Sequence, residues 1–325
     1  MGFWPIWKYA DYVRTHAQGI DQVYLFGPYE EPLDDGNNPS ISLAYHSMPR
    51  WMDRFDIGFD DSAVNFRRNL HCYRVACKNY ISEVRAQFKP IKSSLMGKTL
   101  LAEIGRTGNR VRIIPYWDYL HQNADATPWD GVNETTGKLE SWIAATRRGA
   151  PLWNDGARGP EAGTGAGTNC EIRYTPSMWH AGDGQGKAPD EVLFHELVHA
   201  SRDMRGVAYE GPVNRNYDNT EEYIAIILQN MYLSEKGQDV FRGGHTRGRI
   251  QPLRGADADR LLLNPQHVNM SPASIIQNFK DTQPEFYRDV VNLPPGRPKY
   301  NWVKEFNQNA QQWPLADIYD GVHPY

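Results

Sequence analysis

The feature that most constrains this chain is the run at residues 195–199, which reads His-Glu-Leu-Val-His. It lies in a segment that opens with Pro189, which suits a first helical turn, and two acidic residues follow that favour the positive end of the helix dipole. On such a helix, His195 and His199 lie one turn apart and point the same way. The segment therefore predicts a largely buried helix that presents two imidazoles to a neighbouring element.

This arrangement suits zinc chemistry. Two imidazoles one turn apart can occupy two adjacent corners of a zinc tetrahedron. Glu196 follows the first of them and lies beside the metal without binding it, where it can act as general base towards a zinc-activated water. An amphipathic helix that merely exposes two histidines would match the same five letters. The zinc interpretation therefore depends on a third ligand.

A third ligand is predicted at the start of a second helix, where Asn219 or Thr220 can cap the chain. Glu221 and Glu222 lie about 100° apart round that helix, so normally only one of them can bind the metal. We favour Glu222, because the small Ala225 one turn later would let the two helices approach. Glu221 is the alternative, and the carboxylate that does not bind would orient a ligand histidine or be solvated. Acidic residues also suit any helix N-terminus, but that does not explain their place after the histidine helix.

Hydrolysis also needs a donor for the oxyanion of a tetrahedral intermediate. Tyr217 precedes Glu222 on the connecting loop, at a spacing that could bring its hydroxyl over the metal. We therefore predict Tyr217 as a catalytic residue. Four other side chains compete for this role: Tyr209, Arg215, His245 and Arg247.

The surrounding pattern mixes helices and strands. Residues 62–88 and 94–105 have a helical period, and a strand is predicted from Val111 to its end at Pro115. A Gly-rich stretch covers 149–170, and the alternating run from Cys170 to Pro176 then predicts a short strand. Because loops flank that run, we expect an edge strand beside a cleft. Further helices are expected at 256–263, 274–278 and 302–312.

Composition excludes several classes of protein. A net charge of −4 gives no electrostatic footprint for nucleic acid. No apolar run approaches the roughly 18–20 residues that cross a bilayer, and the first residues form a poor Sec signal peptide. The three cysteines favour buried free thiols over a disulfide scaffold, which fits synthesis in the cytoplasm. They are Cys72, Cys77 and Cys170.

The order of several motifs resembles the NleD-like zinc metallopeptidases, a group of type III effectors and toxin domains. The likeness covers roughly residues 94–235. It includes Gly97 to Pro115, Gly163-Thr-Gly-Ala-Gly-Thr-Asn-Cys-Glu-Ile-Arg-Tyr-Thr-Pro, the histidine motif and Thr220-Glu-Glu-Tyr. The resemblance implies a compact zincin core with a strand above the zinc helix that pairs with extended substrate. It also implies His195, His199 and a downstream glutamate as Zn²⁺ ligands, Glu196 as base, and delivery to other cells.

We therefore predict an α+β fold with a zincin-like core at 94–250, a mainly helical extension at 1–93 and a second extension at 251–325, which together could form one compact domain. The predicted function is a zinc metalloendopeptidase that acts on a protein or peptide as a bacterial effector or toxin. It would leave the bacterium without a Sec signal, with secretion machinery, a chaperone or an immunity protein as partners. One alternative is a zinc amidase that cuts cell-wall peptides in a target periplasm. Another is a binding or delivery protein with a structural zinc site.

Overall fold

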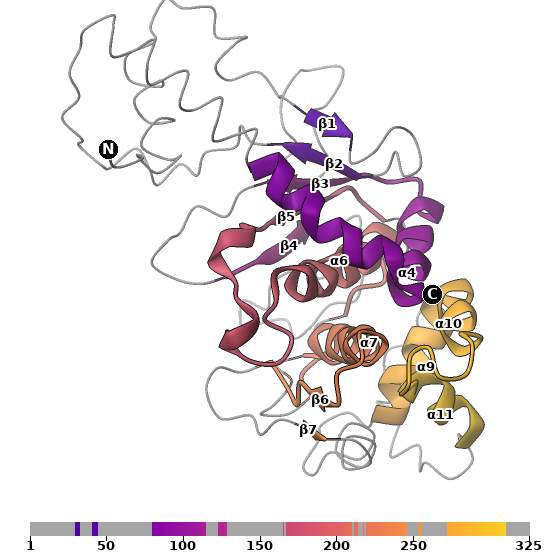
Figure 1. Cartoon of the computed structure of the whole chain (residues 1–325). Helices are drawn as coiled ribbons and strands as arrows, with labels where there is room; N and C mark the ends of the chain where they lie inside the picture. The colour runs from indigo at the N-terminus through magenta and orange to yellow at the C-terminus, as the bar shows by residue number, and fades with distance from the viewer. Residues whose placement is uncertain are drawn as a thin grey trace, which may run out of the picture.

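The structure is a computed structural model of the chain, and it combines one small sheet with packed helices (Figure 1). This mixture confirms the predicted α+β class. The residues that the structure describes are 30–32, 41–44, 80–114, 123–128, 165, 167–209, 211–213, 217, 219–245, 253–254 and 272–309.

Five short strands form the main sheet, in the order β1-β2-β3-β5-β4. The inner pairs β2–β3 and β3–β5 are parallel, whereas β1 and β4 run antiparallel to their neighbours. A separate two-stranded ladder joins β6 and β7. The strands are β1 (Glu30–Pro32), β2 (Ile41–Ala44), β3 (Val111–Ile114), β4 (Asp125–Pro128), β5 (Cys170–Arg173), β6 (Val240–Phe241) and β7 (Leu253–Arg254).

The strand predicted from Cys170 exists, but its predicted place at the edge of the sheet is wrong. β5 pairs with β3 on one side and with β4 on the other, so both of its backbone edges carry hydrogen bonds. Its inward side chains Cys170 and Ile172 are fully buried. The edge belongs instead to β4, whose four residues Asp-Ala-Thr-Pro have too little apolar alternation to predict a strand.

Two long helices carry the predicted site. α6 (Pro189–Arg205) begins with its proline in the first turn and ends at Gly206, whose φ of 70° is the left-handed conformation that glycine adopts readily. α7 (Thr220–Glu235) is capped by the Asn219 side chain, which accepts from the Glu222 N–H. Both predicted helices are confirmed. α6 packs between the sheet and α7, against β4 and β5 (Figure 1).

Residues 80–93 are helical, and α4 (Leu95–Arg106) follows at once. The Ser94 hydroxyl accepts from the Gly97 N–H, and a Cβ at Gly97 would lie only 1.9 Å from the Ile91 carbonyl oxygen. Glycine is therefore required where the two helices meet. The helical prediction for 94–105 is confirmed, and that for 62–88 is confirmed over its described part from residue 80.

The C-terminal part contributes three more helices, α9 (Pro272–Thr282), α10 (Pro284–Val291) and α11 (Trp302–Asn309). They confirm the helices expected at 274–278 and from residue 302. The helix expected at 256–263, most of the Gly-rich stretch and nearly all of the N-terminal extension lie outside the described residues. Two short 3-10 turns, η2 (Pro176–Met178) and η3 (Ala181–Asp183), lead from β5 towards α6.

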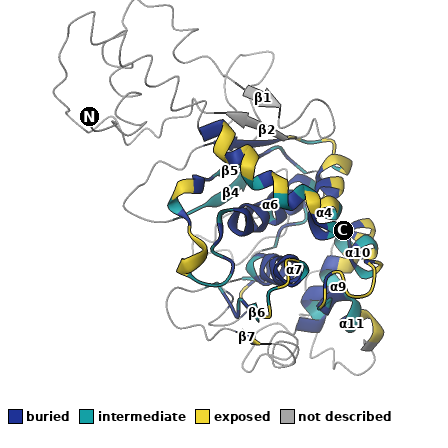
Figure 2. Ribbon diagram, viewed as in Figure 1, coloured by how far each residue is buried: buried dark blue, intermediate teal, exposed yellow. Residues whose placement is uncertain are grey.

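The core lies where α6 and α7 meet, and both helices are buried almost all round (Figure 2). Phe194 of α6 stacks on Tyr232 of α7 with ring centroids 4.6 Å apart, and Ala225 is fully buried. Burial of these helices stabilises them more than helix propensity does. Among the described residues, no helix is both long and apolar enough to span a membrane.

Candidate metal centre

The two histidines of α6 face the same neighbour. His195 Nε2 and His199 Nε2 lie 3.1 Å apart, and the imidazole rings meet edge to face. The side chains are only 4% and 14% exposed. The spacing of one helical turn therefore brings two lone-pair donors to one point, as the sequence predicted.

Glu222 of α7 completes a triangle with them. One carboxylate oxygen lies 3.2 Å from His195 Nε2, and the other lies 3.5 Å from His199 Nε2. The Asn219 cap fixes the turn from which Glu222 projects. Zinc–ligand distances of about 2.0–2.1 Å place neighbouring tetrahedral corners about 3.3–3.4 Å apart. The three side chains therefore have the spacing of three corners of a zinc site.

Glu221 lies elsewhere. One of its oxygens accepts from Arg202 Nε, and the other accepts from the Tyr209 N–H at 2.7 Å. The two neighbouring carboxylates diverge as their separation round a helix requires. Glu221 is neither solvated nor bonded to a ligand histidine in these contacts. It neutralises the fully buried Arg202 instead.

His245 also approaches the triangle, and the sequence named it only as a rival oxyanion donor. Its Nε2 lies 3.4 Å from the Glu222 Oε2, and its ring stacks on that of His195 at 6.0 Å. Ligand atoms of His195, Glu222 and His245 all lie within 4.8 Å of one another. No spacing rule could have placed a residue beyond β6 at this point.

The donor set fits a divalent cation. Imidazole nitrogens and a carboxylate converge with their lone pairs towards one another, which is unfavourable unless a proton or a metal ion lies between them. His195 Nδ1 is a buried polar atom without a hydrogen-bond partner among the described residues, so no second contact there fixes the proton on this ring. The same set of nitrogen and oxygen ligands is the one that zinc takes in proteins.

Electrostatics show how the metal-free site arranges its protons. Burial lowers the pKa of His195 to about 3, so this ring is neutral. Burial would also lower the pKa of His199, but the charge of Glu222 and a hydrogen bond to it raise that pKa to about 9. Burial would raise the pKa of Glu222, and the two histidines hold it well below its usual value. One proton thus lies where a cation would bind, so metal binding should release it.

Glu196 lies beside this cluster without joining it. Burial raises the pKa of its carboxyl to about 8, against a lesser lowering by His199. A pKa near neutrality suits a group that both accepts and returns a proton. Glu196 lines a cavity of about 80 Å³ together with His195 and His245. The other lining residues are Asn123, Ala124, Trp179, Lys187, Val192 and Arg242.

Arg242 is a cation of this cavity that the sequence did not indicate. Its Nη1 donates to Gln229 of α7 at 2.9 Å, and its Nε donates to the Gly244 carbonyl at 3.1 Å. Lys187 lies over the Trp179 ring, 4.8 Å from its centroid. Two basic side chains therefore line the same hollow as Glu196.

Tyr217 does not line the cavity. Its side chain is only 1% exposed, its ring packs against Tyr223 at 4.9 Å, and burial raises the pKa of its hydroxyl above the usual range. Its predicted catalytic role stays a prediction. Of its rivals, His245 lines the cavity and Tyr209 uses its backbone N–H on Glu221, while Arg215 and Arg247 lie outside the described residues.

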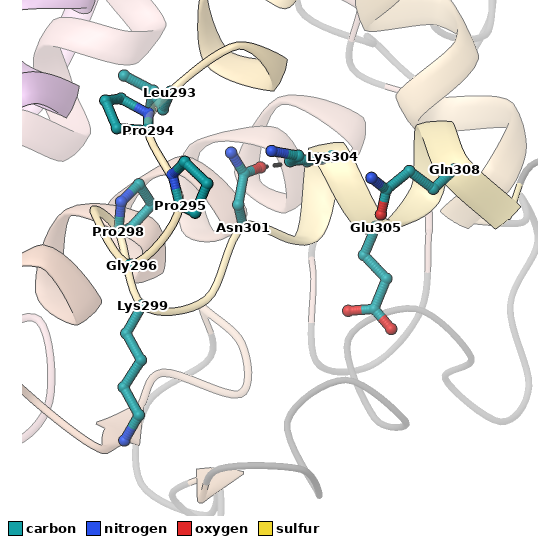
Figure 3. Close-up of a pocket in the computed structure, with 10 residues that line it drawn as sticks. All are labelled: Leu293, Pro294, Pro295, Gly296, Pro298, Lys299, Asn301, Lys304, Glu305 and Gln308. Atoms are coloured by element: carbon teal, nitrogen blue, oxygen red, sulfur yellow. Dashed lines mark hydrogen bonds between the residues drawn. The ribbon is translucent and has the colours of Figure 1, made fainter.

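A second hollow, of about 370 Å³, lies between the α10–α11 connection and α11 (Figure 3). Prolines and polar side chains of α11 are among the residues that line it, and the Asn301 side chain accepts from the Lys304 N–H. It shares no lining residue with the histidine cavity and contains no histidine or cysteine. Nothing in it suggests chemistry.

Comparison with known proteins supports a peptidase. The Peptidase M91 family model, described as effector protein, matches residues 72–238. The match includes both helices that carry the histidines and Glu222 and ends before His245. No curated protein and no solved structure shows a significant match.

Proposed function

The chain belongs to the Peptidase M91 family of effector proteins, and from this premise we propose that it is a zinc-dependent metalloendopeptidase. The observation that carries the proposal is the convergence of His195, His199 and Glu222. Glu196 lines the same cavity as the first of these ligands. A metallopeptidase of this kind needs both parts, because the ligands hold the metal and the free carboxylate moves the proton.

The residues would divide the work as follows. His195, His199 and Glu222 would hold zinc, which when bound polarises the scissile carbonyl and activates water. Glu196 would accept a proton from the attacking water and return it to the leaving amine. Burial raises the pKa of the Glu196 carboxyl to about 8 in the metal-free site, which makes its carboxylate a stronger base towards water. A cation held by the neighbouring ligands would lower that pKa and favour the ionised form that accepts the proton.

The arrangement of α6 and β4 supports a zincin-like core. β4 is the outermost strand of the sheet in the described residues, packs against α6 and runs antiparallel to β5. Ala124, which precedes β4, lines the cavity that contains Glu196. A protein substrate in extended form would add to the edge of β4 that no described strand covers, with its scissile bond above the histidines.

Membership of an effector family supports delivery out of a bacterium and into another cell. Secretion machinery, a chaperone or an immunity protein would then be the natural partners. The extensions on each side of the 94–250 core would be segments of the same chain. None of these partners is needed for peptide-bond hydrolysis itself. They would determine the cell in which the enzyme acts.

Two other functions keep the same zinc ligands. An amidase that acts on cell-wall peptides would show its activity on purified muropeptides and not on unfolded proteins. A binding or delivery protein with a structural zinc site would have no use for Glu196, and its effect on cells would survive loss of that carboxyl. The buried position of Glu196 beside the ligands favours the peptidase over this second alternative.

The central test is Glu196→Gln, which keeps the shape of the side chain and removes its basicity. We expect the variant to bind one zinc per chain, as the unaltered protein should, and to lose peptide hydrolysis by several orders of magnitude. Metal content by mass spectrometry and new protein N-termini in cells that express each form would be measured.

Glu285→Gln, on α10, is the control and should remain active, because Glu285 is exposed and does not line the cavity. Full activity of Glu196→Gln would contradict the mechanism. Absence of bound zinc from the unaltered protein would contradict the metal assignment.

A further inference from the structure

His245 differs from the predicted ligands in how the fold presents it. His195, His199 and Glu222 project from two buried helices, whereas His245 lies in the segment that follows β6. Its side chain is 38% exposed, which is far more than that of His199. It is nonetheless only 3.4 Å from the Glu222 carboxylate. The partly exposed imidazole of His245 thus contacts the buried cluster of His195, His199 and Glu222.

The approach is built into the fold. Asn230, fully buried on α7, donates to the Arg242 carbonyl at 2.8 Å and accepts from the Arg242 N–H at 2.9 Å. Arg242 in turn donates through Nε to the Gly244 carbonyl. The segment that ends at His245 is therefore fastened to the helix that carries Glu222. These two hydrogen bonds of the Asn230 side chain are part-buried and attach the segment to α7 at a defined position.

We propose that His245 is a fourth protein ligand of the metal in the substrate-free enzyme, an inference that rests on the proposed function. The separation of 3.4 Å between His245 Nε2 and Glu222 Oε2 matches the edge of a tetrahedral zinc site, about 3.3–3.4 Å, and the ligand atoms of His195, Glu222 and His245 lie within 4.8 Å of one another. His245 reaches the cluster from a third segment of the chain, the one that follows β6.

His245 is also the ligand that can leave. Catalytic zinc sites keep a position open, whereas sites with four permanent protein ligands are structural. Of the four side chains, His245 is the most exposed and lies on a loop, while the other three are held by helix packing. It lines the cavity with Glu196, so a substrate that enters there must move it aside. The closed form would protect the metal until substrate arrives.

The test measures the metal itself. The full chain would be loaded with Co²⁺, and its visible spectrum would be recorded with and without acetohydroxamate, alongside zinc affinity from competition with a chromogenic chelator. In His245→Ala we expect a weaker tetrahedral band, tighter hydroxamate binding and a loss of zinc affinity of at least about 10-fold. His245→Asn, a second variant, should behave alike.

His180→Ala is the matched control, because His180 is an exposed histidine that does not line the cavity. Thermal melts would establish that each variant folds. If His245→Ala keeps the cobalt spectrum and zinc affinity of His180→Ala, the inference is overturned, even if peptide hydrolysis falls, since the imidazole would then act on substrate alone. His195→Ala tests the premise separately: undiminished zinc affinity in that variant would contradict the proposed function and not only the role of His245.

Discussion

At the scale of single residues, the pair Glu221 and Glu222 shows how one helix assigns two carboxylates to different tasks. They differ by one position, yet Glu222 faces the histidines while Glu221 accepts from Arg202 and the Tyr209 N–H. The cause is the rotation of about 100° between successive residues of a helix. Identical chemistry at neighbouring positions should therefore give different phenotypes.

That difference can be measured with two matched variants. Glu222→Gln should weaken zinc binding by about 100-fold or more. Loss of a residue that only hydrogen-bonds to a metal ligand already costs about 10–100-fold in metal affinity, and loss of a ligand should cost at least as much. Glu221→Gln should bind zinc as the unaltered protein does but unfold at a lower temperature, because it leaves the buried Arg202 charge without its counter-charge. Chelator competition and calorimetry would give both values. An exchange of the two outcomes would mean that Glu221 is the ligand.

At the scale of elements, α6 and α7 are clamped to each other at both ends, which fixes the distance between the ligands that they carry. Arg202 near the end of α6 meets Glu221 at the start of α7. At the other end, Asp190 accepts from the Tyr232 hydroxyl at 2.6 Å and from Lys236 at 2.7 Å. A site held on rigid, mutually bonded helices keeps its ligands in place before the metal arrives.

Arg202 provides the test at this scale. It is fully buried and also donates to Gln283 and to the Val207 carbonyl. Arg202→Ala should lower the free energy of unfolding by about 3–5 kcal/mol, because it leaves the Glu221 charge buried and unpaired. Chemical denaturation of the metal-free protein would measure this. The exposed Arg254→Ala should change it by less than about 0.5 kcal/mol, and equal effects of the two would refute the clamp.

At the scale of the whole molecule, the C-terminal helices are joined to the site through buried polar contacts. Gln283, between α9 and α10, accepts from Arg202 at 3.1 Å and donates to Glu103 of α4 at 3.2 Å. Arg205 of α6 donates to the same carboxylate. The segment that a sequence-based boundary places outside the core is therefore bonded to the helix that carries the histidines. Metal binding should consequently stabilise the sheet and all the joined helices against unfolding, and not α6 and α7 alone.

Removal of the metal should therefore lower the melting temperature of the protein. A ligand that binds only the folded state adds about 4 kcal/mol when its free concentration is 1,000 times its dissociation constant. Differential scanning calorimetry with and without a chelator should detect the loss, and added Zn²⁺ should reverse it. His195→Ala is the control and should melt at one temperature in both conditions. If the chelator lowered the melting temperature of that variant equally, the metal that stabilises the protein would bind at a site other than this one.

Much of the candidate site follows from local sequence. The histidine spacing, the proline at the start of α6 and the glycine that ends it are properties of one helix, so they can be predicted without a tertiary structure. The same holds for the Asn219 cap, which sets the phase of Glu222. Residues of one element have fixed relative directions, because a helix has a fixed period.

Only the tertiary structure decided which distant segments meet this helix. It brought His245 to Glu222 and Arg242 to the cavity, and it made β4 the edge strand in place of β5. It also buried Tyr217, which does not line the cavity. These are contacts between elements, and no period in the sequence encodes them, because loop closure and side-chain packing set them jointly. The chain's local pattern thus determined the helix that carries His195 and His199, and its packing determined which side chains surround them.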